Sequence, residues 1–185
     1  MITEKIRLLA CAMIFASTAL ATTASAETNG WYVEGQYLTL KVESDDDDLS
    51  DADLGGVGFV VGKDLSEYFA IELIAGVGIG DDKIKDDSSS LTLKVEIDQY
   101  YGIVFKPNMD VNERFNVYLD LGYVHLKTET ELSFRRNTSK DSQSVSEFMW
   151  GLGAEVGFTE NFYGTVGYLD IDEFDGFQLS LGYRF

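Results

Sequence analysis

The sequence contains little of several residue types on which common catalytic and nucleic-acid-binding sites depend. It has one cysteine (Cys11), one histidine (His125) and one proline among 185 residues. These single copies exclude an internal disulfide and a Cys/His zinc cluster, because each needs several such side chains. Lys and Arg total 14 against 32 Asp and Glu, a net charge of −18, which leaves no basic patch for nucleic acid. We therefore expect no nucleic-acid partner, and the sequence predicts no cofactor.

Residues 1–26 have the pattern of a secretory signal peptide. A short basic segment precedes the apolar run LLACAMIFASTALA, and Ala24-Ser25-Ala26 fits the small-x-small pattern of a cleavage site. We predict cleavage between Ala26 and Glu27, which leaves residues 27–185 as one exported domain. The alternative is a lipobox at residues 8–11 with a lipid on Cys11, but the apolar run continues well past that cysteine.

From Gly30 onward the chain alternates with a period of two, which is the pattern of β-strands. In the clearest segment Phe69, Ile71 and Leu73 fall on one face, and Ala70 and Glu72 on the other. The segments with this pattern are 30–42, 54–63, 68–80, 91–106, 114–127, 145–158, 162–169 and 177–185. Short connections (64–67, 107–113, 159–161) alternate with longer polar ones (43–53, 81–90, 128–144, 170–176). This order predicts an all-β, eight-stranded antiparallel up-and-down meander, and closure into a barrel would remove its edges.

Two barrel architectures share this pattern: a lipocalin-like barrel is apolar inside, and an outer-membrane barrel is apolar outside. Here the glycines share a face with the polar residues Glu34, Gln36, Glu72, Lys94, Glu96, Asp98, Lys106, Asp120, Glu147, Glu155 and Arg184. The narrow interior of eight strands accommodates glycines and a few long polar chains, whereas aromatic residues on every strand would overfill it. Aromatic residues also gather near both strand ends: Trp31, Phe69, Phe105, Phe115, Phe158 and Phe162 beside the short turns, and Tyr37, Tyr123, Phe148, Trp150 and Phe177 nearer the long loops. Two such girdles favour a transmembrane barrel, and the lipocalin-like binding protein remains the alternative fold.

The opening Gly30-Trp31-Tyr32-Val33, the alternating residues 177–183 and the terminal Tyr183-Arg184-Phe185 resemble the small outer-membrane β-barrel family of Gram-negative bacteria. That family includes the OmpA transmembrane domain and the OmpX/Ail-type barrels, and the resemblance covers residues 27–185. It implies periplasmic termini, longer loops outside the cell, and surroundings of outer-membrane lipid and lipopolysaccharide. It also implies that Tyr183 and Phe185 form the C-terminal signal read by the barrel-assembly machinery. The sequence ends at the barrel, so the peptidoglycan-binding domain of longer relatives is not expected.

OmpA-like barrels hold a network of Glu with Arg or Lys across the lumen. The resemblance therefore implies a polar lumen network drawn from Glu34, Glu72, Lys94, Glu96, Asp120, Glu155 and Arg184.

These features predict a structural or surface-interaction role, in envelope integrity or in adhesion through acidic extracellular loops that bind an outside ligand. A narrow porin-like channel with an acidic lumen is the alternative. An enzyme is not expected: the lipid A deacylase among small barrels resembles a Ser–His–acid hydrolase with a serine two residues after its histidine, and here Lys127 follows His125 at that spacing. The acidic runs at residues 45–48 and 81–87 are typical of solvated loops, so no metal site is predicted.

Overall fold

The computed structural model describes residues 30–42, 52–79, 82–85, 91–134, 137–172 and 174–185. The strands are β1 (Trp31–Val42), β2 (Ala52–Ser66), β3 (Phe69–Ile79), β4 (Asp82–Lys85), β5 (Leu91–Asn112), β6 (Phe115–Phe134), β7 (Asn137–Gly157), β8 (Phe162–Ile171) and β9 (Phe174–Arg184). Across the described residues, no helix is long and apolar enough to cross a membrane.

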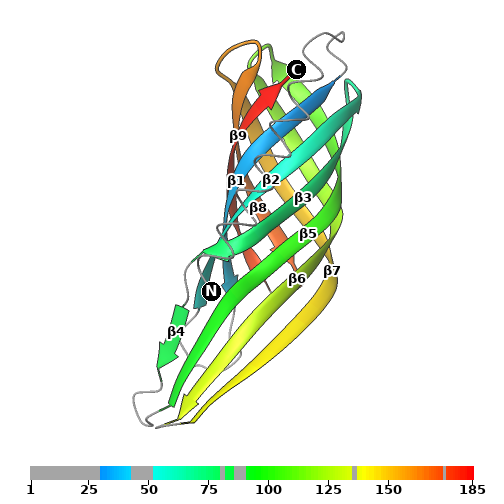
Figure 1. Ribbon diagram of the computed structural model, residues 1–185. Helices are drawn as coiled ribbons and strands as arrows, with labels where there is room; N and C mark the ends of the chain where they lie inside the picture. The colour runs from blue at the N-terminus through cyan, green and yellow to red at the C-terminus, as the bar shows by residue number, and fades with distance from the viewer. Residues whose placement is uncertain (1–29, 43–51, 80–81, 86–90, 135–136, 173) are drawn as a thin grey trace.

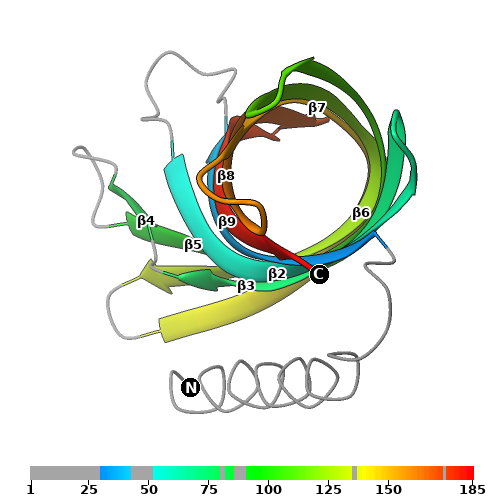
Figure 2. The same cartoon turned by 90° about the horizontal axis from the view of Figure 1, so that it is seen from above.

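Eight of these strands close into a barrel. The sheet runs β3-β2-β1-β9-β8-β7-β6-β5-β4, and a further pairing between β3 and β5 closes the ring. Every pairing is antiparallel, and β1 lies between β2 and β9, so the first and last strands meet at one seam. Figure 2 shows the ring from above, with β4 outside it beside β5. The predicted eight-stranded up-and-down barrel is confirmed.

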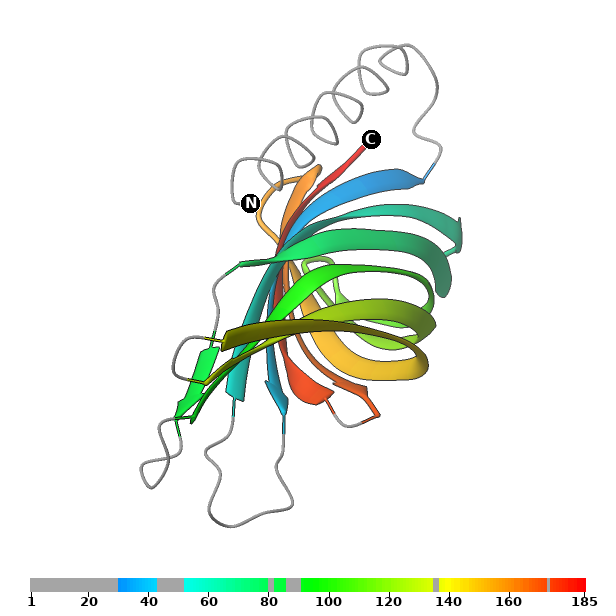
Figure 3. The same ribbon diagram turned by 60° about the horizontal axis from the view of Figure 1, so that its bottom comes forward.

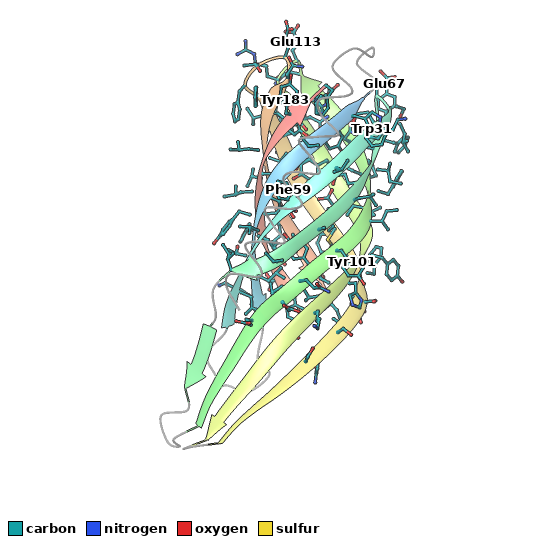
Figure 4. All side chains as sticks on the ribbon, viewed as in Figure 1. Trp31, Phe59, Glu67, Tyr101, Glu113 and Tyr183 are labelled. Atoms are coloured by element: carbon teal, nitrogen blue, oxygen red, sulfur yellow. The ribbon has the colours of Figure 1, made fainter. Side chains whose placement is uncertain are left out.

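The apolar face of the barrel is its outer face. Leu181, Leu73 and Leu152 are more than half exposed, whereas Glu34, Glu72 and Asp120 are buried. Figure 4 shows Tyr101 pointing away from the barrel wall. A lipocalin-like barrel would have the opposite arrangement, since its ligand cavity is apolar.

Three strands are much longer than the alternation predicted. β5, β6 and β7 have 22, 20 and 21 residues, and they continue past the closed ring as a sheet that also includes β4 (Figures 1 and 3). The predicted loop at residues 128–144 is therefore wrong, because β6 and β7 remain paired up to Phe134 and Asn137. The sequence of this hairpin is polar at almost every position, so it lacks the apolar face by which a half-buried strand is recognised.

A β-bulge in β5 changes which side chains enter the lumen. The pairing with β6 shifts between Ile97 and Gln99, and Asp98 is the extra residue. Such a bulge reverses the faces on which the preceding residues lie. Ile97 is accordingly buried inside the barrel, which places Glu96 on the opposite face. Asp98 lies 3.0 Å from Lys127, an outward residue of β6.

Candidate functional site

Lys106 lies at the centre of the lumen among three acidic side chains. Its Nζ forms an ion pair with Glu72 and lies 3.8 Å from Asp120 Oδ1, and both acidic side chains are only 4% exposed. Glu34 is also buried and lines the same enclosed cavity. One ammonium group faces three carboxyl groups, so neutral hydrogen-bond donors are also needed to stabilise this cluster.

Those donors come from neutral side chains on other strands. The Tyr32 hydroxyl donates to Glu72 at 2.7 Å, and the Tyr163 hydroxyl donates to Glu34 at 2.9 Å. The third carboxyl group, that of Asp120, accepts from Gln178 Nε2 at 2.9 Å, and Gln36 Nε2 in turn donates to Gln178 Oε1 at 2.8 Å. Each carboxyl group of the Lys106 cluster therefore has a neutral hydrogen-bond donor, and Glu72 and Asp120 also share the lysine.

A second cluster surrounds Arg184 at the short-turn end. Its Nη1 lies 3.3 Å from Glu155 Oε1, and its Nε lies 3.5 Å from Asp64 Oδ2. The guanidinium carbon lies 4.9 Å from the ring centre of Tyr163 and 5.6 Å from that of Tyr32, which are distances of cation–π contacts. Arg184 thus joins the last strand to β2, β7, β8 and β1, and its chemistry is that of a structural clamp.

The lumen is polar in only one half. The half toward the long loops is filled by an apolar cluster: Leu38, Leu40, Leu54, Val60, Ile74, Ile97, Tyr100, Val104, Val124, Leu126, Met149, Leu169 and Ile171. The enclosed space between this apolar cluster and the Lys106 cluster is about 20 Å³, room for about one water molecule. At the short-turn end a polar vestibule of about 300 Å³ is lined by residues that include Asp64, Asn108 and Asn116. The expectation of a polar lumen holds mainly for one half, because most inward positions near the long loops carry Leu, Ile and Val.

The structure divides the predicted lumen residues among three places. Glu34, Glu72 and Asp120 lie in the Lys106 cluster, and Glu155 and Arg184 in the second cluster. Glu96 lies on the face opposite the lumen because of the bulge at Asp98. The side chain of Lys94 lies outside the described residues.

Sequence reasoning missed the tyrosine donors of the lumen. Their signal was present, because each inward tyrosine pairs with a glycine on the neighbouring strand. The pairs are Tyr32 with Gly62, Tyr100 with Gly76, Tyr118 with Gly153 and Tyr163 with Gly182. Each phenol ring lies over its neighbouring glycine, in the space that a Cβ there would occupy.

The terminal aromatic residues lie at the seam of the barrel. Tyr183 packs edge-to-face on Phe162, with ring centres 4.9 Å apart, and on Phe185 at 5.1 Å. The backbone N–H of Phe185 donates to the carbonyl oxygen of Trp31 at 3.0 Å. The predicted role of Tyr183 and Phe185 as an assembly signal stays a prediction, and Ala24, Ala26 and Glu27 lie outside the described residues.

Aromatic side chains border the outer apolar surface at both ends. Near the short turns, Phe69 stacks on Phe105 with ring centres 5.4 Å apart, and Lys63 Nζ lies 5.2 Å from the ring centre of Trp31. Nearer the long loops, Tyr123 packs on Phe148 at 6.0 Å, and other exposed rings include Tyr101, Trp150 and Phe177. This is the arrangement by which barrels meet the two lipid–water interfaces.

His125 has a serine beside it that sequence spacing did not reveal. Its Nδ1 lies 2.8 Å from the Ser146 hydroxyl on β7, and its ring packs on Tyr101 with centres 4.9 Å apart. The sequence argument considered only the position two residues after His125, whereas Ser146 lies beside the histidine across the sheet. A hydrolytic site also needs a group that orients the imidazole, and here a tyrosine ring packs on it. The contacts are those of an outward histidine whose Nδ1 pairs with a hydroxyl group.

Most residues of the acidic loops predicted from the sequence lie outside the described residues. Residues 43–51, 80–81 and 86–90 are not among the described residues. Within the part that is described, no group of three or more His, Cys, Asp or Glu side chains is placed to hold a metal ion. Residues 170–176 form a tight hairpin in which Asp170 pairs with Asp175, and Asp172 has a positive φ of 53°.

A closed antiparallel barrel with an apolar outer belt, aromatic borders and a partly polar lumen is the architecture of bacterial outer-membrane β-barrel proteins. Residues 8–185 match the family described as outer membrane protein beta-barrel domain, and the chain belongs to this family. It is therefore an outer-membrane protein of the Gram-negative type. No curated protein matches the sequence.

Solved structures of small outer-membrane barrels share the fold. The attachment invasion locus protein Ail of Yersinia pestis has a TM-score of 0.58 and 19% identity, over 85% of this chain and 99% of Ail. Neisserial surface protein A has a TM-score of 0.54 and 16% identity, over 84% of this chain and 97% of its own. OprG from Pseudomonas aeruginosa has a TM-score of 0.54 and 14% identity, over 84% of this chain and 96% of its own. None of these three is described as an enzyme.

Proposed function

We propose that this protein is a rigid outer-membrane scaffold that presents a β-sheet outside the cell for interaction with other molecules. One observation carries the proposal: β5, β6 and β7 continue as a paired sheet beyond the closed ring, at the end opposite the short turns (Figure 1). A barrel that served only to fill the membrane would need strands of about 9–11 residues. The additional length of β5, β6 and β7 forms the sheet beyond the ring, which we call the platform. Such a platform would serve adhesion or envelope integrity.

The lumen supports a scaffold better than a channel. Leu40 and Leu126 are completely or almost completely buried in the apolar cluster, and the cavity beside it is about 20 Å³. An ion would lose its hydration in such a segment without gaining polar ligands, at a large cost in free energy. For this reason we favour the scaffold over the narrow channel.

The surroundings of the barrel follow from the family. The resemblance supports an orientation with the short turns and both termini in the periplasm and the platform outside the cell. Outer-membrane lipid and lipopolysaccharide would then cover the apolar belt, and the barrel-assembly machinery would read Tyr183 and Phe185. Residues 1–26 would be removed on export.

The partner that we favour is a protein. Ail has been solved in complex with the heparin analogue sucrose octasulfate. This chain carries a net charge of −18, and Arg135, Arg136 and Lys140 are a small group of basic residues close together in its sequence. Repulsion by the remaining charge opposes the binding of a sulfated polysaccharide.

A shortened hairpin tests the proposal. Glu129 and Ser142 are cross-strand partners, so residues 130–141 are replaced by an Asn-Gly turn that joins them. Cells that carry the full-length or the shortened protein are compared for retention on surfaces coated with serum proteins or with heparin. We expect cells with the full-length protein to be retained on serum proteins more strongly than cells with the shortened protein.

One control and two contrary outcomes make the result decisive. Both proteins must show the mobility shift on boiling in SDS that closed barrels display, since loss of the fold would also remove adhesion. Equal retention by the two proteins would contradict a role of the platform. Retention on heparin alone would identify a polyanion as the partner and contradict the choice of a protein.

A further inference from the structure

We propose that two hydrogen bonds in the lumen, Gln36 to Gln178 and Tyr163 to Glu34, set the register in which the barrel closes at the β1–β9 seam. The inference goes beyond the proposed function, because it concerns how the first strand meets the last strand and not what the platform binds. The device is a pattern of tyrosines and glycines that repeats around the lumen.

One belt of inward residues takes a single residue from each of the eight barrel strands. On one side of the seam, Tyr100 of β5 lies over the glycines of β3 and β2, and its hydroxyl donates to Gln36 Oε1 of β1 at 3.3 Å. On the other side, Tyr118 of β6 extends over the glycines of β7 and β8, and its hydroxyl accepts from Gln178 Nε2 of β9 at 3.4 Å. In spatial order the belt is Tyr118, Gly153, Gly167, Gln178, Gln36, Gly58, Gly76 and Tyr100. Its two halves mirror each other about the seam, and Gln36 Nε2 joins them by donating to Gln178 Oε1 at 2.8 Å.

A second row of inward residues crosses the seam nearer the short turns. Tyr163 of β8 lies over the glycine of β9, and its hydroxyl donates to Glu34 of β1 at 2.9 Å. The same pattern occurs away from the seam, where Tyr32 of β1 lies over the glycine of β2 and donates to Glu72 of β3 at 2.7 Å. Each phenol therefore reaches a carboxyl group two strands away, and the row of Tyr163 is the copy that spans the seam.

The outer face of the seam does not determine the register by itself. In the structure Gly35 of β1 pairs with Leu181 of β9. A slip of one residue would exchange the two faces of a strand, but a slip of two residues leaves every side chain on its own face. Gly35 would then pair with Leu179 or with Tyr183, which lie on the same face of β9 as Leu181. Lipid would cover the belt in all three registers.

The lumen contacts do distinguish these registers. A slip of two residues in one direction places Tyr32 where Glu34 now pairs with the glycine of β9, so the Tyr163 ring would meet a second phenol ring instead of a carboxyl group. A slip in the other direction places Gln178 opposite Leu40 of the apolar cluster and separates it from Gln36.

Either slip moves the strands by about 7 Å, which is farther than a hydrogen bond can follow. Glu34, Gln36, Gln178 and Tyr163 are all buried, so a register that leaves them without partners is penalised. Selection of register is the best-attested use of buried polar groups.

Cysteine pairs on the outer face report the register, because the chain contains only Cys11. Each tested chain carries Cys11→Ser and Gly35→Cys, together with Leu181→Cys, Leu179→Cys or Tyr183→Cys. Directly opposite residues are within reach of a disulfide, whereas residues two positions farther along lie about 7–8 Å apart and are not. The proteins are refolded from urea into lipid vesicles and oxidised, and the cross-linked fraction is measured by electrophoresis without reductant.

Tyr163→Phe combined with Gln36→Leu removes both hydrogen bonds across the seam. Tyr32→Phe combined with Tyr100→Phe is the matched control, because it removes two lumen hydrogen bonds that do not cross the seam. In the wild type and in the control we expect the disulfide between positions 35 and 181 to dominate. In the test variant we expect the yield of the slipped disulfides, 35 to 179 or 35 to 183, to rise about tenfold or more, since two hydrogen bonds no longer oppose them.

A test variant whose slipped disulfides stay at the wild-type yield would overturn the inference. An equal rise of the slipped disulfides in the control would overturn it too, because the register would then depend on the lumen contacts in general. Every variant is first checked for the mobility shift on boiling. If the double variant lacks this shift, the single variants Tyr163→Phe and Gln36→Leu replace it and are judged by the same outcomes.

Discussion

At the scale of single residues, Lys106 is the side chain on which the polar half of the lumen depends. It is the cation that contacts both Glu72 and Asp120, and its own side chain is 11% exposed. The tyrosine and glutamine donors stabilise the carboxyl groups but do not offset their charge. A buried ion pair of this kind adds little net stability, yet its disruption leaves uncompensated charge in a closed space.

We expect Lys106→Met to lower the free energy of unfolding by about 3–5 kcal/mol, because the buried carboxyl groups lose their counter-charge. The measurement is equilibrium unfolding in urea, in lipid vesicles, followed by tryptophan fluorescence. Lys63→Met is the matched control: Lys63 lies near Trp31 on the outer face, and its loss is expected to cost less than about 1 kcal/mol. Similar costs for the two variants would mean that water reaches the Lys106 cluster.

At the scale of strands, the glycines opposite the lumen tyrosines determine how neighbouring strands pack. A Cβ placed on Gly182 would lie 2.2 Å from the Tyr163 ring, whereas one placed on Gly35, on the outer face, would meet nothing within 4 Å. The Tyr163 ring cannot move without losing the hydrogen bond of its hydroxyl to Glu34.

Gly182→Ala is therefore expected to destabilise the barrel by about 1–3 kcal/mol, as an overpacked interior does. Gly35→Ala is the matched control, with an expected change within about 0.5 kcal/mol. Urea unfolding under identical conditions compares the two. A neutral Gly182→Ala would show that the Tyr163 ring has another position available.

The strands also show where the sequence was sufficient and where it was not. The alternation of Phe69, Ile71 and Leu73 predicted β3 almost to its ends, because one face meets lipid and the other the lumen. The outer parts of β6 and β7 were predicted as a loop, since both of their faces are polar. The bulge at Asp98 was not predicted either, because an added residue leaves the local composition unchanged.

At the scale of the whole molecule, the lumen has one open end and one closed end. The vestibule leads from the short turns to the Lys106 cluster, and the apolar cluster blocks the remaining half. The barrel is therefore a filled cylinder from which a paired sheet continues at the end opposite the short turns.

The wild-type protein is accordingly expected to show no sustained current in planar lipid bilayers. Leu40→Ser combined with Leu126→Ser removes bulk and adds hydroxyl groups in the blocking segment, so a steady current is expected from this variant. The single-channel recording is made at several voltages. A sustained wild-type current would contradict the filled lumen and restore the channel as the function.

The sequence by itself determined an all-β barrel and favoured an outer-membrane one, because a period of two and the aromatic borders are local patterns that lipid and water select directly; only the outward apolar face in the structure excluded the lipocalin-like alternative. It also placed Glu34, Glu72, Asp120, Glu155 and Arg184 on the inward face. Only the tertiary structure decided which of these share a cluster, since partners such as Glu34 and Tyr163 come from strands far apart in the chain. The tertiary structure also decided which inward side chains meet to form the apolar half of the lumen. It decided as well that β7 lacks a second neighbour at residues 137–148 among the described strands, because this depends on where β8 ends.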